Sequence, residues 1–284
     1  MVPGLVFDPK ADRTVTGPAL TAMGEELLAK PENTSKQFFA WSHYTDPHED
    51  YLKHEECPDW GNGQRDRYDS EICFTDLWIG RLLDWAATQP WWKNTAVIVT
   101  SDHGEAFGEH AMKRHAFNLW QVLVRVPLMI KVPGAKPKRI DRPRSQIDLA
   151  PTIAELMGVQ RPDAFVGRSL VPEIHGWAEP DNREPIVLDL PEDTDNPSLR
   201  AIIEDGYKLT ATGKQSCLLF DLTKDPAEEH DLARREPTVL TRMTQRFAQV
   251  SARIPQVEPF GGMKLSSGRL ANGTMQPAAS SQVH

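Results

Sequence analysis

The chain has 284 residues, a net charge of −8 at pH 7 and a hydrophobic content of 39%, which together are ordinary for a globular protein. The excess of acidic groups argues against a general binder of nucleic acid or of anionic membranes. No apolar run approaches the roughly 18 residues that a membrane-spanning helix needs, and the first residues lack the basic and apolar regions of a signal peptide.

The first part of the chain alternates between predicted helices and strands. Leu20, Met23 and Leu27 recur at helical spacing before Pro31, and short apolar runs indicate buried strands of a parallel sheet. In the long predicted helix the apolar stripe includes Asp76, whose carboxylate would need a buried partner. The predicted helices cover residues 17–30, 68–88, 117–124 and 147–157, and the predicted strands cover residues 37–42, 96–99 and 127–132.

The second part is richer in strands and indicates a small antiparallel sheet. Its predicted elements are strands over residues 186–190, 199–204 and 218–222, a short extended segment at 208–210, and a helix over 237–254. This order predicts an α/β fold with a mostly parallel sheet flanked by helices, followed by a small α+β subdomain. The predicted domains are a partial α/β domain over residues 1–180, the α+β subdomain over 181–254 and a disordered tail over 255–284.

The cysteines do not identify a metal site. Cys57, Cys73 and Cys217 form neither a CxxC pair nor a zinc-ligand spacing. An odd number of cysteines gives no disulfide framework, so the sequence leaves a single bridge open.

The chain has a polar cluster directly after the predicted strand over residues 96–99. Asp102 and His103 lie side by side there, and His110 and His115 follow within a few residues. Ligands bind at the carboxyl ends of strands in open α/β sheets, and carboxylate oxygen and imidazole nitrogen are donors for divalent cations. The pattern therefore favours half of a metal site, in which Gly104 and Gly108 would let the loop bend. The alternative is a polar loop that caps the next helix.

A second polar cluster follows the predicted strand over residues 37–42. It contains His43, Asp46 and His48, with Pro47 in the turn. The functional interpretation is that His43 or His48 reaches an anionic substrate. The alternative is a surface loop whose histidines have no such role.

Several motifs together resemble the sulfatases of the alkaline phosphatase superfamily. The segment FFAWSHYTDPH (residues 38–48) is similar to the segment of that family with the pattern FF, H and DPH. SDHGE (101–105), GEH (108–110) and His115 resemble its second metal and substrate segment. RVPL (125–128), DLAPT (148–152), GRSL (167–170) and LFDLTKDP (219–226) follow in the order seen there.

The resemblance implies an alkaline-phosphatase-like sheet and a metal-assisted hydrolysis of sulfuric esters. It gives Asp102 and His103 the role of metal ligands, and it makes His48 and His115 catalytic. His43 and His110 are expected to bind substrate. The implied cofactor is one divalent cation. Ca²⁺ is typical of sulfatases, while the nitrogen of His103 also suits Mn²⁺ or Zn²⁺.

One departure from the family is serious. The nucleophile of sulfatases lies in an N-terminal C/S-x-P-x-R segment, and this chain contains none. We therefore expect a C-terminal portion of a sulfatase-like enzyme, with its first strands missing and with little or no turnover as it stands. An exposed sheet edge would then invite pairing with the missing N-terminal half.

The sequence leaves three functions open. The first is the hydrolysis of sulfuric esters. The second is phosphoester or phosphonate hydrolysis, or phosphoethanolamine-type transfer, on the same scaffold, because His103 and His115 also occur together in those branches. The third is a non-catalytic remnant or binding protein. The compartment stays open too, since many relatives are exported or anchored through N-terminal segments.

Overall fold

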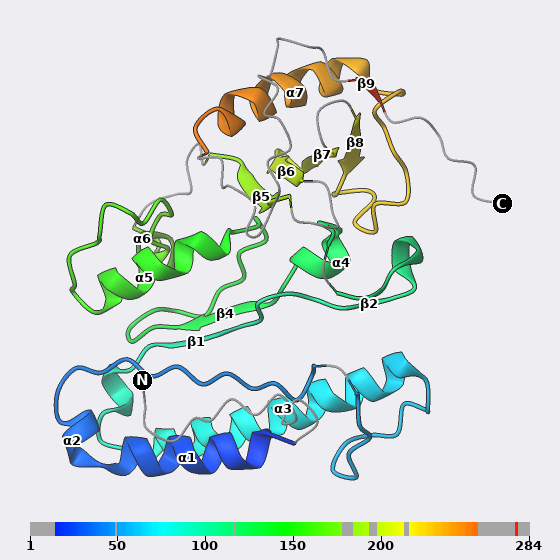
Figure 1. Cartoon of the computed structure of the whole chain (residues 1–284). Helices are drawn as coiled ribbons and strands as arrows, with labels where there is room; N and C mark the ends of the chain where they lie inside the picture. Colours follow the sequence, from blue (N-terminus) through cyan, green and yellow to red (C-terminus); the bar gives the residue numbers. More distant parts are fainter. Residues whose placement is uncertain are drawn as a thin grey trace. The chain divides into compact units, whose positions relative to one another are not determined.

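The computed structural model describes residues 15–48, 50–115, 117–177, 184–192, 198–212 and 216–254, together with the backbone of 276–277. The chain forms two compact units, and each is described by itself. The first unit comprises Met1–Val97 and Ile130–Gly134, and the second comprises Ile98–Met129 and Ala135–His284 (Figure 1). The predicted domain limits at residues 180 and 254 stay a prediction. The predicted tail lies outside the described residues, except for residues 276–277.

The first unit is built on two helices. α1 (Gly17–Ala29) packs along α3 (Gln64–Ala87), and a single helical turn, α2 (Pro31–Thr34), follows α1. The buried carboxylate of Asp46 accepts the backbone N–H groups of Thr16 at 2.7 Å and Gly17 at 3.0 Å, at the start of α1. Such a carboxylate satisfies free N–H groups and complements the helix dipole. One acid of the second polar cluster therefore has a structural role.

The predicted apolar stripe of α3 is wrong at its first two positions, while Ala86 at its end is buried as predicted. Asp76 and Ile72 are exposed, whereas the buried side chains of this helix include Glu71 and Phe74. The helix is covered both by α1 and by the loop that precedes it, so the buried face differs from the one that spacing alone selects. In that loop, His54 Nε2 lies 2.7 Å from Glu71 Oε2, and the His54 ring stacks on Phe74 at 3.8 Å.

A disulfide between Cys57 and Cys73 joins the same loop to α3. The sequence had left this bridge open. Within α3, Asp66 Oδ2 also accepts the backbone N–H of Gly63 at 2.8 Å, which places the start of the helix four residues before the predicted one.

The predicted strand over residues 37–42 is wrong as well. The segment is extended but pairs with none of the described strands, and Phe39 and Trp41 are 56% and 78% exposed. An apolar run forms a buried strand only where neighbours pair with its backbone and cover its faces. For the same reason β1 (Val97–Thr100), which forms a two-stranded sheet with β4 (Leu128–Lys131), is half-buried and not fully buried as predicted.

The second unit contains a hairpin, three short helices and the C-terminal sheet with its helix. The hairpin consists of β2 (Ala106–Phe107) and β3 (Lys113–Arg114), joined by a 3₁₀ turn at Glu109–Ala111. The short helices are α4 (Gln121–Val124), α5 (Leu149–Leu156) and α6 (Val171–His175). α4 begins four residues later than the helix predicted over 117–124. None of the helices in the described residues has the length and apolar character that crossing a membrane requires.

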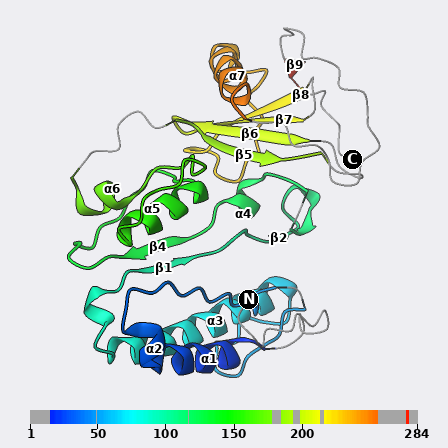
Figure 2. The ribbon, with the colours of Figure 1, turned by 60° about the vertical axis from the view of Figure 1, so that its left-hand side comes forward.

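The C-terminal sheet confirms the predicted antiparallel sheet. Its antiparallel strands are β5 (Ile186–Leu190), β6 (Leu199–Glu204), β7 (Tyr207–Thr212) and β8 (Ser216–Asp221), and the short β9 (Gln276–Pro277) pairs parallel with β8. Helix α7 (Pro237–Ser251) follows β8 along the chain and covers one face of the sheet (Figures 1 and 2).

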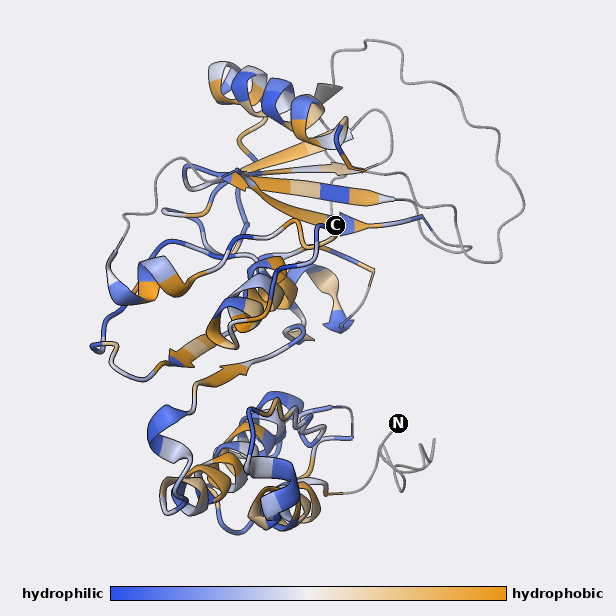
Figure 3. Cartoon of the chain, turned by 90° about the vertical axis from the view of Figure 1, so that its left-hand side faces the viewer, coloured by the Kyte–Doolittle hydropathy of each residue, from blue (hydrophilic) through white to orange (hydrophobic). Residues whose placement is uncertain are grey.

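Both faces of this sheet are covered, because each strand alternates its side chains between them. On one face Ile202, Leu209 and Leu219 pack against Met243 and Phe247 of α7. On the other face Leu199 and Ala201 pack against Leu119, which precedes α4. Figure 3 shows much of these strands as hydrophobic, as expected for a sheet that is buried on two sides.

Candidate functional site

The loop of residues 101–105 follows β1 and rests on α4. The backbone N–H of Gly104 donates a hydrogen bond to the carbonyl of Leu123 at 2.7 Å. A Cβ atom at position 104 would lie 2.1 Å from the carbonyl oxygen of Val122, so only glycine fits. The sequence predicted that Gly104 would let this loop bend, beside a ligand. In this structure Gly104 closely approaches the backbone of α4.

Two of the predicted site histidines lie together. The rings of His103 and His115 stack with their centroids 4.3 Å apart and an interplanar angle of 28°. His115 Nδ1 lies 3.0 Å from Oε2 of Glu105, a buried carboxylate that comes from the loop itself. The carboxylate orients the His115 ring, and the stacking holds this ring beside that of His103. In the sequence, Glu105 was noted only as the last residue of the SDHGE segment.

Asp102 and His103 have the donor atoms that a divalent cation requires. His103 Nδ1 lies 2.9 Å from the carbonyl of Gly104, so Nδ1–H donates there and Nε2 keeps a lone pair for a ligand bond. This Nε2 lies 3.8 Å from Asp102 Oδ2, and both side chains are partly exposed. The two residues fit a cation as half of its ligand set, and further donors would have to complete it.

Gln146 also contacts this loop, and sequence analysis missed it. Its Nε2 donates a hydrogen bond to the carbonyl of Ser101 at 2.6 Å. Gln146 lies in the 3₁₀ turn before α5, two residues ahead of the DLAPT motif. The motif indicated this part of the chain. No local sequence pattern, however, distinguishes a glutamine that bonds to a distant loop from one that faces solvent.

The contacts of His110 are with other residues than His103 and His115. Its ring stacks on Trp120 with centroids 3.8 Å apart, and its Nε2 lies 2.9 Å from the carbonyl of Ala227. Its backbone has a φ of 51°, in the left-handed region that residues other than glycine rarely adopt. The predicted contact of His110 with substrate stays a prediction.

His43 and His48 are exposed residues of the first compact unit. They flank Asp46, whose carboxylate caps α1. The backbone N–H of His48 donates to the carbonyl of Thr45 at 3.0 Å in the turn that Pro47 occupies. The roles predicted for these two histidines stay predictions.

A further group of acids and a histidine lies elsewhere in the second unit. Ligand atoms of Asp225, Glu229 and His230 lie within 4.8 Å of one another. However, the two oxygens of Asp225 accept the backbone N–H groups of Glu229 at 3.0 Å and His230 at 2.8 Å. Asp225 therefore holds the turn after β8.

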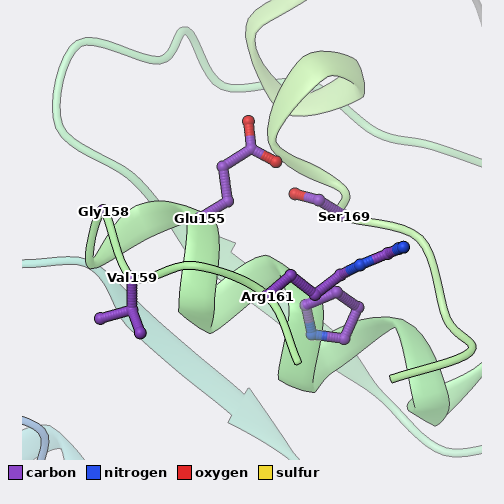
Figure 4. A pocket seen from close by; sticks show the side chains of 6 residues that line it. Glu155, Gly158, Val159, Arg161 and Ser169 are labelled. Atoms are coloured by element: carbon purple, nitrogen blue, oxygen red, sulfur yellow. The ribbon is translucent and has the colours of Figure 1, made fainter. Parts of the chain in front are cut away.

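A shallow pocket of about 370 Å³ lies at the end of α5 (Figure 4). The residues that line it are Pro151, Glu155, Gly158, Val159, Arg161 and Ser169. None of the predicted site residues lines this pocket, and Arg161 at its edge donates to the carbonyl of Gly167 at 3.3 Å.

Most of the chain is similar to known protein families. The profile described as sulfatase matches residues 13–159, and that described as N-sulphoglucosamine sulphohydrolase, C-terminal, matches residues 108–253. The uncharacterized sulfatase YidJ of Escherichia coli is 33% identical over 166 residues, which are 56% of this chain and 32% of the relative. The choline-sulfatase of Rhizobium meliloti is 31% identical over 172 residues, which are 60% of this chain and 33% of the relative.

Solved structures agree with these matches. The phosphonate monoester hydrolase of Silicibacter pomeroyi has a TM-score of 0.59 and 25% identity, over 66% of this chain and 41% of that chain. The structural neighbours confirm the predicted alkaline-phosphatase-like fold. The matched part of this chain spans about a third of the length of the two curated relatives.

Proposed function

The chain belongs to the sulfatase family, and on this basis we propose that it supplies the metal-binding and substrate-binding part of a hydrolase of sulfuric esters. One observation carries the proposal. The loop after β1 presents Asp102 and His103 as cation donors and stacks His103 on His115, which Glu105 holds in place. A loop that only capped a helix would not need this arrangement.

Asp102 and His103 would hold one divalent cation, with the remaining ligands supplied from outside this loop. When bound, the cation would polarise the ester oxygens and help to ionise a nucleophile. Ca²⁺ is expected from the family, and the imidazole nitrogen of His103 makes Mn²⁺ or Zn²⁺ suitable as well.

The other residues act on the substrate directly. His115 contacts an oxygen of the sulfate group, and Glu105 fixes the orientation of its ring through the 3.0 Å contact with Nδ1. His48 donates a proton to the leaving oxygen as a general acid. His43 and His110 contact the anionic part of the substrate. These roles are taken from the resemblance to sulfatases and are part of the proposal.

The nucleophile belongs to a second segment. The chain contains no C-x-P-x-R or S-x-P-x-R sequence, and its match covers about a third of its curated relatives. We include in the proposal that an N-terminal portion carrying the nucleophile pairs with this chain, and that the chain alone has little or no turnover. The exposed apolar side chains of Phe39 and Trp41, on an extended segment, are a surface suited to such pairing.

A second candidate is the hydrolysis of phosphoesters or phosphonates. It is favoured by the pair of imidazoles at His103 and His115 and by the likeness to a phosphonate monoester hydrolase. Phosphoethanolamine-type transfer belongs to the same alternative. A third candidate, of another class, is a non-catalytic protein that binds sulfate or phosphate esters.

An ester assay tests the proposal. The chain alone, and the product of the longest reading frame that contains it, are offered aryl sulfate and aryl phosphate with Ca²⁺, Mn²⁺ or Zn²⁺. We expect turnover of aryl sulfate only by the longer product, and its loss with chelator and with His115→Ala. Preference for aryl phosphate by several orders of magnitude would select the second candidate. No turnover of either ester by any product would leave the binding protein.

A further inference from the structure

A lysine and a glutamate form an ion pair in the interior of the second unit. Lys208 of β7 is completely buried, and its Nζ lies 2.7 Å from Oε1 of the buried Glu228. Burial lowers the pKa of Lys208, and the neighbouring Glu228 opposes this change. Removing two charges from water is unfavourable, and an apolar pair of similar volume often gives equal or greater stability. Stability alone therefore does not account for this pair.

Both members of the pair bind the backbone that leads into α4. The ammonium of Lys208 donates a hydrogen bond to the carbonyl of Leu119. Glu228 Oε2 accepts the backbone N–H of Gln121, the first residue of α4, at 2.5 Å. A helix of one turn has no stability of its own in water, so its position depends on such contacts. The ion pair thus fixes where α4 begins.

α4 in turn contacts the loop of residues 101–105, and Trp120 just before it contacts His110. Its carbonyl at Leu123 accepts the N–H of Gly104, next to His103. Trp120, between the two anchored residues, stacks on His110 at 3.8 Å and meets Phe220 of β8 edge-on at 5.8 Å. Figure 2 shows α4 on the side of the C-terminal sheet opposite α7.

We propose that Lys208 and Glu228 are positioning residues that transmit the rigidity of the C-terminal sheet, through α4, to the loop of residues 101–105. The inference rests on the proposed function only in assigning that loop a metal. The C-terminal subdomain then does more than complete the fold, because it determines whether Asp102 and His103 are held ready for a cation. Groups that hydrogen-bond to metal ligands and orient them change metal affinity by about 10- to 100-fold.

The double variant Lys208→Met with Glu228→Leu separates positioning from stability. It removes both charges and all contacts to residues 119 and 121 while keeping an apolar pair of similar size. Hydrogen exchange is measured at the Gly104 amide and, as an internal reference, at Leu209 in β7. We expect unfolding in urea to change little, while the protection of Gly104 relative to Leu209 falls by about tenfold or more and Mn²⁺ affinity falls by about tenfold.

Two further variants keep the test decisive. Met243→Ala removes a fully buried side chain on the α7 face of the same sheet, so it should lower stability without changing the ratio of protection. If the double variant does not fold, Glu228→Gln takes its place. Combined with Lys208→Met, it leaves no unpaired charge and keeps an oxygen for Gln121, so it should lower the ratio less than the first double variant does.

The outcomes distinguish the inference from the proposed function. An unchanged ratio of protection in the charge-free variant would overturn the inference, whatever the metal does. A lowered ratio in a chain whose wild type does not bind Mn²⁺ would support positioning and count against the metal site. A lowered ratio with weakened Mn²⁺ binding would support both.

Discussion

Replacing Gly104 by alanine should displace the loop that carries Asp102 and His103. The added Cβ would lie 2.1 Å from the carbonyl oxygen of Val122, and this atom belongs to the backbone and cannot rotate away. Relief requires a shift of roughly 1 Å, and such overpacking costs about 1–3 kcal/mol. The shift also strains the hydrogen bond from Gly104 to Leu123, which contributes about 1 kcal/mol. We expect a loss of about 2–4 kcal/mol in the free energy of unfolding.

Urea unfolding measures this loss, and Gly80→Ala provides the matched control. A Cβ at Gly80 meets no atom within 4 Å, and the residue lies inside α3. Alanine in the middle of a helix is more stable than glycine by about 0.5–1 kcal/mol, so the control should be neutral or stabilising. If Gly104→Ala were as stable as the wild type, the close packing of this loop on α4 would be refuted.

Two other predictions concern the contacts between α3 and the loop before it. Burial raises the pKa of Glu71 above its usual value of 4.5, so the stability given by its protonated form is complete below about pH 4.5 and is lost as pH rises through the raised value. The unfolding free energy of the wild type relative to Glu71→Gln should therefore fall as pH rises above 4.5, and a constant difference would contradict this. Replacing Cys57 and Cys73 by serine opens a 16-residue loop and should cost about 3 kcal/mol in urea unfolding. Dithiothreitol should destabilise the wild type by a similar amount and leave this variant unchanged, whereas equal sensitivity would refute the bridge.

Elements whose stability comes from local periodicity were predictable from the sequence. The helix that begins at Gly17 and the strands of the C-terminal sheet carry clear helical and strand patterns, and the structure has them within a few residues. The loop of residues 101–105 was also recognisable, because a carboxylate, an imidazole and a glycine follow an apolar run directly.

Features that depend on distant partners were not predictable. The stripe through Asp76 has good helical spacing. However, His54 of the preceding loop contacts Glu71, so the buried carboxylate of α3 is that of Glu71 and not that of Asp76. Similarly, the helix predicted over residues 117–124 is shortened to Gln121–Val124, and Trp120 just before it contacts His110 and Phe220. No local pattern indicates such pairs, since their members lie many residues apart.

The most direct test of the candidate site is a titration of the purified chain with Mn²⁺, followed by calorimetry. The wild type is compared with Asp102→Ala and with Asp225→Ala, which alters the other group of acids and a histidine. We predict weak binding by the wild type, at least tenfold weaker binding by Asp102→Ala, and unchanged binding by Asp225→Ala. Equal binding by the wild type and Asp102→Ala, with a loss in Asp225→Ala, would contradict a metal site at Asp102 and His103.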